Sequence, residues 1–194
     1  MKDKNFFAML SRMRYINRWG LMRNTLPENI SEHSLDVAVI AHALAVIRNI
    51  CYQGNVNAER VALLALFHDC TEIITGDMPT PVKYYAPEIR AAYREVEAAA
   101  KNSLLEGLPE QFQHTYAPLL AETEEEKELW TLVKAADKLS ALIKCIEERR
   151  MGNDDFKRAE ETTITAIKEM KLQEAEYFMN EFLPAYCLTL DEQT

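Results

Sequence analysis

Helical periodicity runs through nearly every segment of this sequence and constrains its fold more than any other feature. Between turn signals the apolar residues recur at spacings of three and four rather than two, and only 5 glycines and 7 prolines interrupt the 194 residues. The pattern predicts an all-α fold. Because the chain is a little over one typical domain length, we expect residues 1–194 to form a single domain.

The most apolar segment, from Asn29 to about Cys51, is predicted to be the central helix of a bundle. Asn29 followed three residues later by Glu32 is typical of a capping box, which starts a helix. Apolar side chains cover almost every side of the segment, so we expect the other helices to pack around it and His42 to be a hydrogen-bonded core residue. Its longest apolar run, inside 37–47, is interrupted by His42 and is too short to cross a membrane.

Capping and turn residues place the remaining helices. We expect one helix from Asn57 to about Thr75, and another that starts at a Thr123–Glu126 capping box and runs to about Gly152. The other predicted segments are an opening helix over 6–16, an irregular loop over 77–81, a polar helix over 87–107, a short segment over 108–116, and a last helical stretch over 154–183 that is continuous or broken.

The composition is that of an ordinary globular protein, with 48% hydrophobic and 27% charged residues. A net charge of -9 argues against long nucleic acid as a partner, because a phosphate backbone needs clustered cations. The first residues lack the apolar stretch of a signal peptide, so we expect a cytoplasmic protein with no membrane segment. The widely spaced cysteines are interpreted as small buried hydrophobic residues: Cys51, Cys70, Cys145 and Cys187.

Histidine and aspartate occur where charged side chains are not expected. His68 and Asp69 end an apolar helical run, and Asp137 lies inside a strongly apolar helix. Ionised groups are seldom buried unless they are paired or bind a metal. His33, in the first turn of the central helix, supplies a further ligand if the three helices converge. The sequence therefore predicts a metal site of two imidazoles and two carboxylates.

The order of these residues, a lone histidine, a His-Asp pair and a distant aspartate, resembles the HD-domain phosphohydrolase superfamily. Four short motifs are also similar to the bacterial 5'-deoxynucleotidase family, and the likeness covers essentially the whole chain. They are Ile-Asn-Arg-Trp at 16–19, Ser-Glu-His-Ser-Leu at 31–35, Gly-Asp-Met-Pro-Thr-Pro-Val-Lys at 76–83 and Lys-Ala-Ala-Asp at 134–137.

The resemblance implies a single HD-domain helical bundle that acts as a metal-dependent 5'-deoxynucleotidase. Such an enzyme hydrolyses 2'-deoxyribonucleoside 5'-monophosphates to deoxyribonucleoside and phosphate with broad base tolerance, and the family suggests a homodimer. The implied cofactor is a divalent metal cation, Co²⁺ or Mn²⁺, held by His33, His68, Asp69 and Asp137. Ligand type alone does not choose the ion, because a mixed nitrogen and oxygen set also suits iron and zinc.

The family likeness implies further roles around the metal. Glu72 would orient or deprotonate the attacking water, and it stands four residues after His68 on the same face of the predicted helix. Asp77 would contact the sugar or protonate the leaving oxygen. Arg18 would be a forked donor for the phosphate, and Trp19 a wall that excludes the ribose 2'-hydroxyl. The remaining substrate contacts are expected from His33, Asp69, Asp77, Met78, Pro79, Thr80 and Asp137.

Structural interpretations of the same residues stay open at this point. His68 and Asp69 alone fit a salt bridge that caps a helix, and Glu72 fits a solvated helix end. Arg18 fits a pair with a surface acid, and Trp19 fits the core. Asp77 fits a turn before a proline.

Two other functions also fit the HD pattern. One is a different HD activity, on triphosphates, cyclic nucleotides or (p)ppGpp, and the other is a degenerate domain that senses nucleotides without catalysis. A triphosphate needs more cations than Arg18 and Lys83 supply. The four ligands and Glu72 are all retained, which argues against the degenerate domain.

Overall fold

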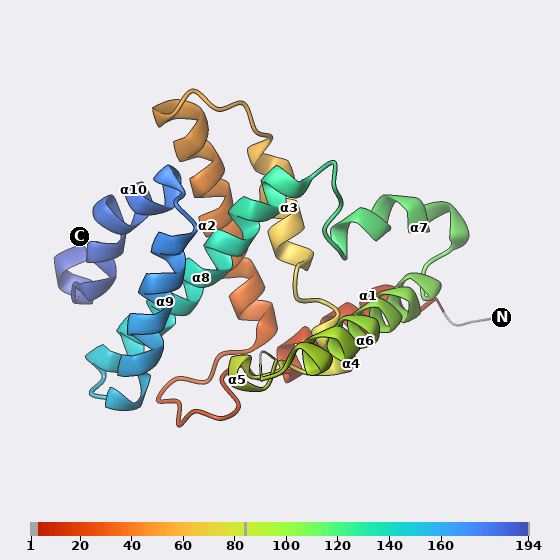
Figure 1. Cartoon of the computed structure of the whole chain (residues 1–194), viewed down its shortest axis with the longest axis horizontal. Helices are drawn as coiled ribbons and strands as arrows, with labels where there is room; N and C mark the ends of the chain where they lie inside the picture. Colours follow the sequence, from red (N-terminus) through yellow and green to blue (C-terminus); the bar gives the residue numbers. More distant parts are fainter. Residues whose placement is uncertain (1–3, 84, 194) are drawn as a thin grey trace.

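The structure, a computed structural model, describes residues 4–83 and 85–193, and every regular element within them is a helix or a helical turn (Figure 1). The α-helices are α1 (Phe6–Leu10), α2 (Ile30–Cys51), α3 (Ala58–Phe67), α4 (Glu72–Thr75), α5 (Thr80–Lys83), α6 (Pro87–Glu106), α7 (Glu110–Tyr116), α8 (Lys127–Arg150), α9 (Lys157–Glu169) and α10 (Gln173–Glu181). Short 3-10 turns are η1 (Ser11–Tyr15), η2 (Ala117–Leu119), η3 (Asp154–Phe156), η4 (Leu183–Cys187) and η5 (Leu190–Gln193). The prediction of an all-α fold is confirmed.

Helix α2 lies at the centre of the bundle and packs against α3, α8 and α10 (Figure 1). Its start is the predicted capping box: the Asn29 side chain accepts from the backbone N–H groups of Ser31 and Glu32, and the Glu32 carboxylate accepts from the Asn29 N–H. The helix contributes Val37, Ile40, Ala41 and Leu44 to the main core, where they meet Leu64, Leu139 and Leu142.

The prediction that α2 is buried on almost every side is wrong. Leu35 and Val39 are 58% and 63% exposed, and His42 is also exposed rather than a core residue. Neighbouring helices cover only part of the circumference, so one stripe of apolar side chains faces outward. The helix extends beyond its longest apolar run at both ends, so by length and composition it could span a membrane; its packing against three neighbours is that of a core helix.

A second core lies at the end of the bundle where α1, α4 and α6 meet (Figure 1). Its buried members come from distant parts of the chain: Phe6, Met13, Ile30, Cys70, Ile73, Leu104, Leu108 and Leu120. Because Ile30 opens α2 and Cys70 follows α3, this core fixes those helix ends relative to each other. His33 follows Ile30 within the first turn of α2 and Asp69 directly precedes Cys70, so the second core also positions these two predicted metal ligands.

The helix predicted over Asn57 to Thr75 begins as expected but breaks in the middle. Asn57 caps it by accepting from the Arg60 N–H, yet α3 ends at Phe67 and a new helix, α4, starts at Glu72. Between them the backbone forms tight turns, with the Cys70 N–H donating to the Phe67 carbonyl over 3.1 Å. The turn lets the side chains of Cys70 and Ile73 pack in the second core, where both are buried. Glu72 therefore does not share a continuous helical face with His68, and that argument for its role was wrong.

The capping box predicted at Thr123 and Glu126 is also wrong. Helix α8 starts at Lys127 without a side-chain cap, because the Glu126 carboxylate accepts from the Arg60 guanidinium over 2.6 and 2.9 Å. The last predicted stretch is broken, since Lys171 has a positive φ of 53° between α9 and α10. Two of the four free cysteines, Cys51 and Cys187, are exposed, so the buried interpretation holds only for the other two.

The loop between η1 and α2 is held against α8 by a buried carboxylate. Glu148 accepts from the backbone N–H groups of Thr25 and Leu26, from Lys144 and from Asn153. Asn153 also donates to the Arg23 carbonyl over 2.7 Å. Burial alone would raise the pKa of Glu148, but these donors outweigh it and lower the pKa to about 2.

We expect Glu148→Gln to lower the free energy of unfolding by about 3 kcal/mol at neutral pH, because it leaves Lys144 buried without its anion. The stability that the ionised Glu148 contributes is fully present above its unfolded-state pKa and is lost as the pH falls toward about 2. The difference in unfolding free energy between the wild type and Glu148→Gln should therefore shrink below about pH 5. Urea unfolding at several pH values measures this. Glu161→Gln, at an exposed acid, is the control, and a difference that does not change with pH would contradict the interpretation.

Candidate active site

The four predicted metal ligands come together from three separate segments. His33 lies in the first turn of α2, His68 and Asp69 lie in the turn after α3, and Asp137 lies in the middle of α8. His33 Nε2 is 3.1 Å from an Asp137 oxygen and 3.5 Å from an Asp69 oxygen, and His68 Nε2 is 3.1 Å from the same Asp69 oxygen. His33, His68 and Asp69 each offer one potential ligand atom, and these three atoms lie within 4.8 Å of one another.

Both imidazoles are oriented by their second nitrogen. His68 Nδ1 donates to the Ala65 carbonyl over 2.7 Å, and His33 Nδ1 is 3.2 Å from the Ser140 hydroxyl. The Nε2 atoms of both rings are buried and have no hydrogen-bond partner. A buried polar atom without a partner is rare, and a histidine whose Nδ1 is fixed by a carbonyl presents Nε2 to a metal. The donor set therefore fits a divalent cation.

The two carboxylates of this cluster, Asp69 and Asp137, both have a lowered pKa. Burial opposes ionisation of Asp137, but the adjacent His33 and Arg18 outweigh it and hold its pKa well below the ordinary range. The pKa of Asp69 is likewise lowered, because the His68 contact outweighs burial. The side chains of Asp69 and Asp137 are 22% and 38% exposed. These acids are therefore only partly buried, whereas the sequence predicted that they are buried. They line the open side of the cluster.

Glu72 carries the largest opposite shift. Burial, together with repulsion from Asp69 and Asp77, raises the pKa of Glu72 to about 9, and its Oε2 is buried without a hydrogen-bond partner. Burial also raises the pKa of Asp77, against the effect of Arg18. Glu72 is thus a buried carboxyl close to the cluster rather than a solvated residue at a helix end.

Arg18 is the cation that faces these acids. Its side chain is 12% exposed, and its guanidinium nitrogens lie 3.7 Å from Glu28 and 3.9 Å from Asp137. The backbone holds it there, because the Arg18 N–H donates to the Glu28 carbonyl and Asn17 pairs with Asn29. A pair with a surface acid is therefore excluded as its main contact.

Trp19 continues from Arg18 in a left-handed backbone conformation, with a φ of 58°. Its backbone N–H donates to Asp77 over 3.2 Å, and its indole N–H donates to Glu28 over 2.8 Å. The indole lies 5.3 Å from the ring of Phe156, which is fully buried. Polar and aromatic contacts on several sides fix the orientation of this ring.

The loop after α4 is joined to the site through Asp77. Gly76 has a φ of 74°, which brings Asp77 back toward Trp19. Met78 and Pro79 are half-buried and Thr80 is exposed at the start of α5. The structure thus brings Asp77 into contact with the predicted site and places Met78, Pro79 and Thr80 directly beyond it.

Ser140 and Glu28 contact the predicted ligand His33 but were not predicted from the sequence. Ser140 lies one turn after Asp137 on α8, and Glu28 directly precedes the Asn29 cap. The spacing of Ser140 from Asp137 was a usable signal. Glu28 gave none, because its contacts are with residues that only the folded loop brings near.

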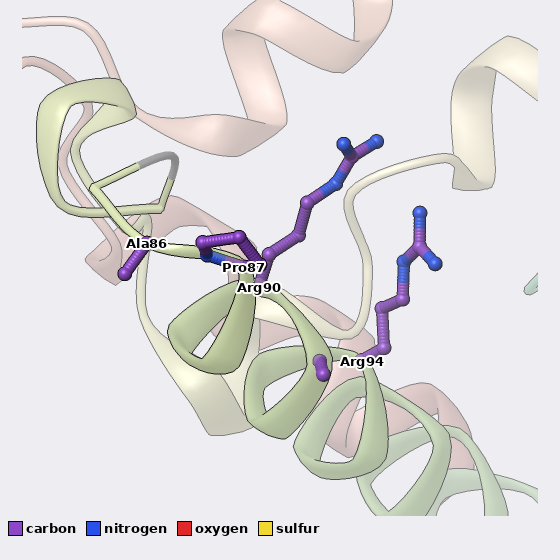
Figure 2. Close-up of a pocket in the computed structure, with 5 residues that line it drawn as sticks. Ala86, Pro87, Arg90 and Arg94 are labelled. Atoms are coloured by element: carbon purple, nitrogen blue, oxygen red, sulfur yellow. The ribbon is translucent and has the colours of Figure 1, made fainter.

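A separate pocket of about 340 Å³ lies at the start of α6. Its lining consists of Ala86, Pro87, Arg90, Ala91 and Arg94, and none of these residues was predicted in the site. Figure 2 shows the Arg90 and Arg94 side chains extending from the same side of the helix. The helical spacing of four residues places them on one face.

A helical bundle with His33 on one helix, the His68-Asp69 pair after the next and Asp137 on a later one defines an HD-domain phosphohydrolase. An HD-domain phosphohydrolase from Listeria innocua has the same fold, with a TM-score of 0.79 and 28% identity over 94% of this chain and 88% of that one. The chain belongs to the 5'-deoxynucleotidase YfbR-like family, whose model matches residues 5–186. It is a hydrolase that acts on phosphoric monoesters.

Relatives in this family span the whole chain. The 5'-deoxynucleotidase VP0926 of Vibrio parahaemolyticus is 50% identical over 99% of both chains. The 5'-deoxynucleotidase YfbR of Escherichia coli O1:K1 is 49% identical over 99% of this chain and 96% of that one. A cyanophage S-2L HD phosphohydrolase, with bound dA and one catalytic Zn²⁺, shares the fold at a TM-score of 0.66 and 20% identity, covering 92% of this chain and 95% of that one.

Proposed function

We propose that this chain hydrolyses 2'-deoxyribonucleoside 5'-monophosphates to deoxyribonucleoside and phosphate, with broad base tolerance. The observation that carries the proposal is the pair of unpartnered Nε2 atoms of His33 and His68 beside Asp69, with the Arg18 guanidinium across the same cluster. The names of relatives about half identical over the full chain support the substrate class.

The metal is proposed to be a divalent cation, Co²⁺ or Mn²⁺, held by His33, His68, Asp69 and Asp137. Bound there, it would supply a Lewis acid that acidifies water and neutralises negative charge on the phosphoryl oxygens. The two histidines are neutral donors, and the two aspartates together cancel the charge of a divalent cation. The positive charge of Arg18 therefore makes the centre attractive to a phosphate.

The protein's own groups would then align the substrate. Arg18 offers a forked donor to the phosphate, a geometry that suits a monoester better than a lysine does. Glu72 has a buried and unpartnered carboxyl oxygen, and a cation bound in the cluster would lower its pKa from about 9, so that the carboxylate would orient or deprotonate the attacking water. Asp77 would contact the sugar or protonate the leaving oxygen, and Met78, Pro79 and Thr80 would line the nucleoside beyond it.

Sugar selection is assigned to Trp19. Its indole is fixed by Glu28 and Phe156, so it can act as a rigid wall against a 2'-hydroxyl. Base tolerance follows if the base edges meet no hydrogen-bonding side chain. A single domain over 1–194 and a cytoplasmic location stay predictions from the sequence, and a homodimer stays a prediction from the family resemblance.

Adding Co²⁺ or Mn²⁺ to metal-stripped protein is expected to raise the Tm, because an ion at about 100 times its Kd adds about 2.7 kcal/mol of stability. Asp137→Asn should fold and lose most of this shift, since it removes an anionic donor. Glu161→Gln, which changes an exposed acid on α9, serves as the control. An unchanged metal-dependent shift in Asp137→Asn would remove it from the ligand set.

Glu72→Gln should bind the metal as tightly as the wild type and lower kcat by about 10²–10⁴ fold, because the amide cannot accept the proton of the water. Isothermal titration with Co²⁺ and phosphate release under saturating substrate separate the two effects. Full activity in this variant would exclude Glu72 as the base.

Phosphate release from paired deoxy- and ribonucleoside monophosphates tests the substrate. We expect the wild type to prefer the deoxy member of every pair, and Trp19→Ala to reduce that preference about tenfold to a hundredfold by opening space for the 2'-hydroxyl. Deoxynucleoside triphosphates should be poor substrates. Equal turnover of both sugars by the wild type would refute the selective function.

A further inference from the structure

Glu28 contacts three groups that belong to different parts of the proposed site. One carboxylate oxygen accepts from the Trp19 indole N–H over 2.8 Å and lies 3.7 Å from an Arg18 guanidinium nitrogen. The other oxygen lies 3.8 Å from Nδ1 of His33, the ring nitrogen that is not proposed to bind the metal. Its side chain is 12% exposed, so the carboxylate is largely shielded from water.

The backbone makes this position rigid. Glu28 accepts from the Arg18 N–H through its own carbonyl, and the next residue, Asn29, caps α2. Further back, Thr25 and Leu26 are bound by the buried Glu148. These backbone contacts hold the Glu28 side chain beside its three partners.

We propose that Glu28 is a positioning residue that locks the Trp19 indole and the Arg18 guanidinium in one fixed arrangement, so that sugar selection and phosphate alignment are set by the same carboxylate. The inference rests on the proposed function for the roles of Trp19 and Arg18. Glu28 itself need not touch the substrate, and its effect on the reaction passes through those two side chains.

The chemistry of the side chain separates its two tasks. The indole N–H needs only an acceptor oxygen, which a glutamine amide also provides. The Arg18 guanidinium needs a negative charge to oppose its attraction toward Asp137, 3.9 Å away, and an amide supplies none. Glu28→Gln should therefore keep the indole in place and release the guanidinium, whereas Glu28→Ala should release both.

Steady-state kinetics with paired deoxy- and ribonucleoside monophosphates test this separation. For Glu28→Gln we expect the deoxy preference of the wild type to remain and KM to rise about tenfold, because Arg18 is free to turn from the phosphate. For Glu28→Ala we expect the same rise in KM and, in addition, a loss of about tenfold in the preference. Glu32→Gln changes an exposed neighbouring acid of the α2 cap and should alter neither quantity.

Trp19 fluorescence supplies a readout that does not depend on metal or activity. In a Trp130→Phe background, Trp19 is the remaining tryptophan of the chain. Its emission and its quenching by acrylamide in metal-free protein should be unchanged in Glu28→Gln, and in Glu28→Ala they should shift to longer wavelength and to greater quenching. Rescue by glutamine distinguishes a positioning contact from a general loss of structure, and circular dichroism checks that each variant is folded.

The outcomes separate this inference from the proposed function. Wild-type selectivity and unchanged fluorescence in Glu28→Ala would overturn the role of Glu28 and leave the deoxynucleotidase function intact. A wild type that does not prefer deoxynucleotides would overturn the function, and the fluorescence of the two variants would still decide whether Glu28 holds the indole. If Glu28→Ala does not fold, Glu28→Asp, whose carboxylate is one methylene shorter, replaces it in both measurements with the same expected loss.

Discussion

The contact of His33 with Asp137 and Asp69 is the interaction on which the rest of the site depends, because it joins α2, the turn after α3 and α8 at one point. Carboxylates outnumber cations there: Asp69, Asp137 and Asp77 face the single guanidinium of Arg18. Such a cluster is stable only when a cation or protons balance it. Burial, together with repulsion from Asp69 and Asp77, raises the pKa of Glu72, so the site opposes one more negative charge.

Sequence reasoning succeeded where the determining contacts are local. The start of α2 was predictable because the side chains of Asn29 and Glu32 each accept from a backbone N–H of the other residue within one turn, and the HD pattern picked out four side chains that the fold brings together. It failed where a residue distant in the sequence determines where a helix begins or ends. The chain turns after Phe67 because the second core draws in Cys70 and Ile73, and the α8 cap is lost because Glu126 binds an arginine far away in the sequence. Neither partner can be read from neighbouring residues.

Stability and the proposed sugar selectivity are linked through the loop between η1 and α2. Glu148 binds this loop at Thr25 and Leu26, and Phe156 packs against the Trp19 ring. Both residues are buried: Glu148 lies near the end of α8, and Phe156 lies in η3 directly after it. The indole is therefore held by contacts within the protein and does not depend on a bound ligand for its position. A polar network of this kind rigidifies the elements it joins when every member is satisfied.

Two of the proposed metal ligands and the two residues proposed to select the substrate are carried by different kinds of structure. His33 and Asp137 project from long helices of the main core, whereas Arg18, Trp19 and Glu28 belong to one irregular loop. Helices fix donor positions closely, and loops accept substitutions with little effect on the core. The residues proposed to set sugar and phosphate preference in this fold therefore lie in the segments at 16–28 and 77–80, apart from the two long helices that carry His33 and Asp137.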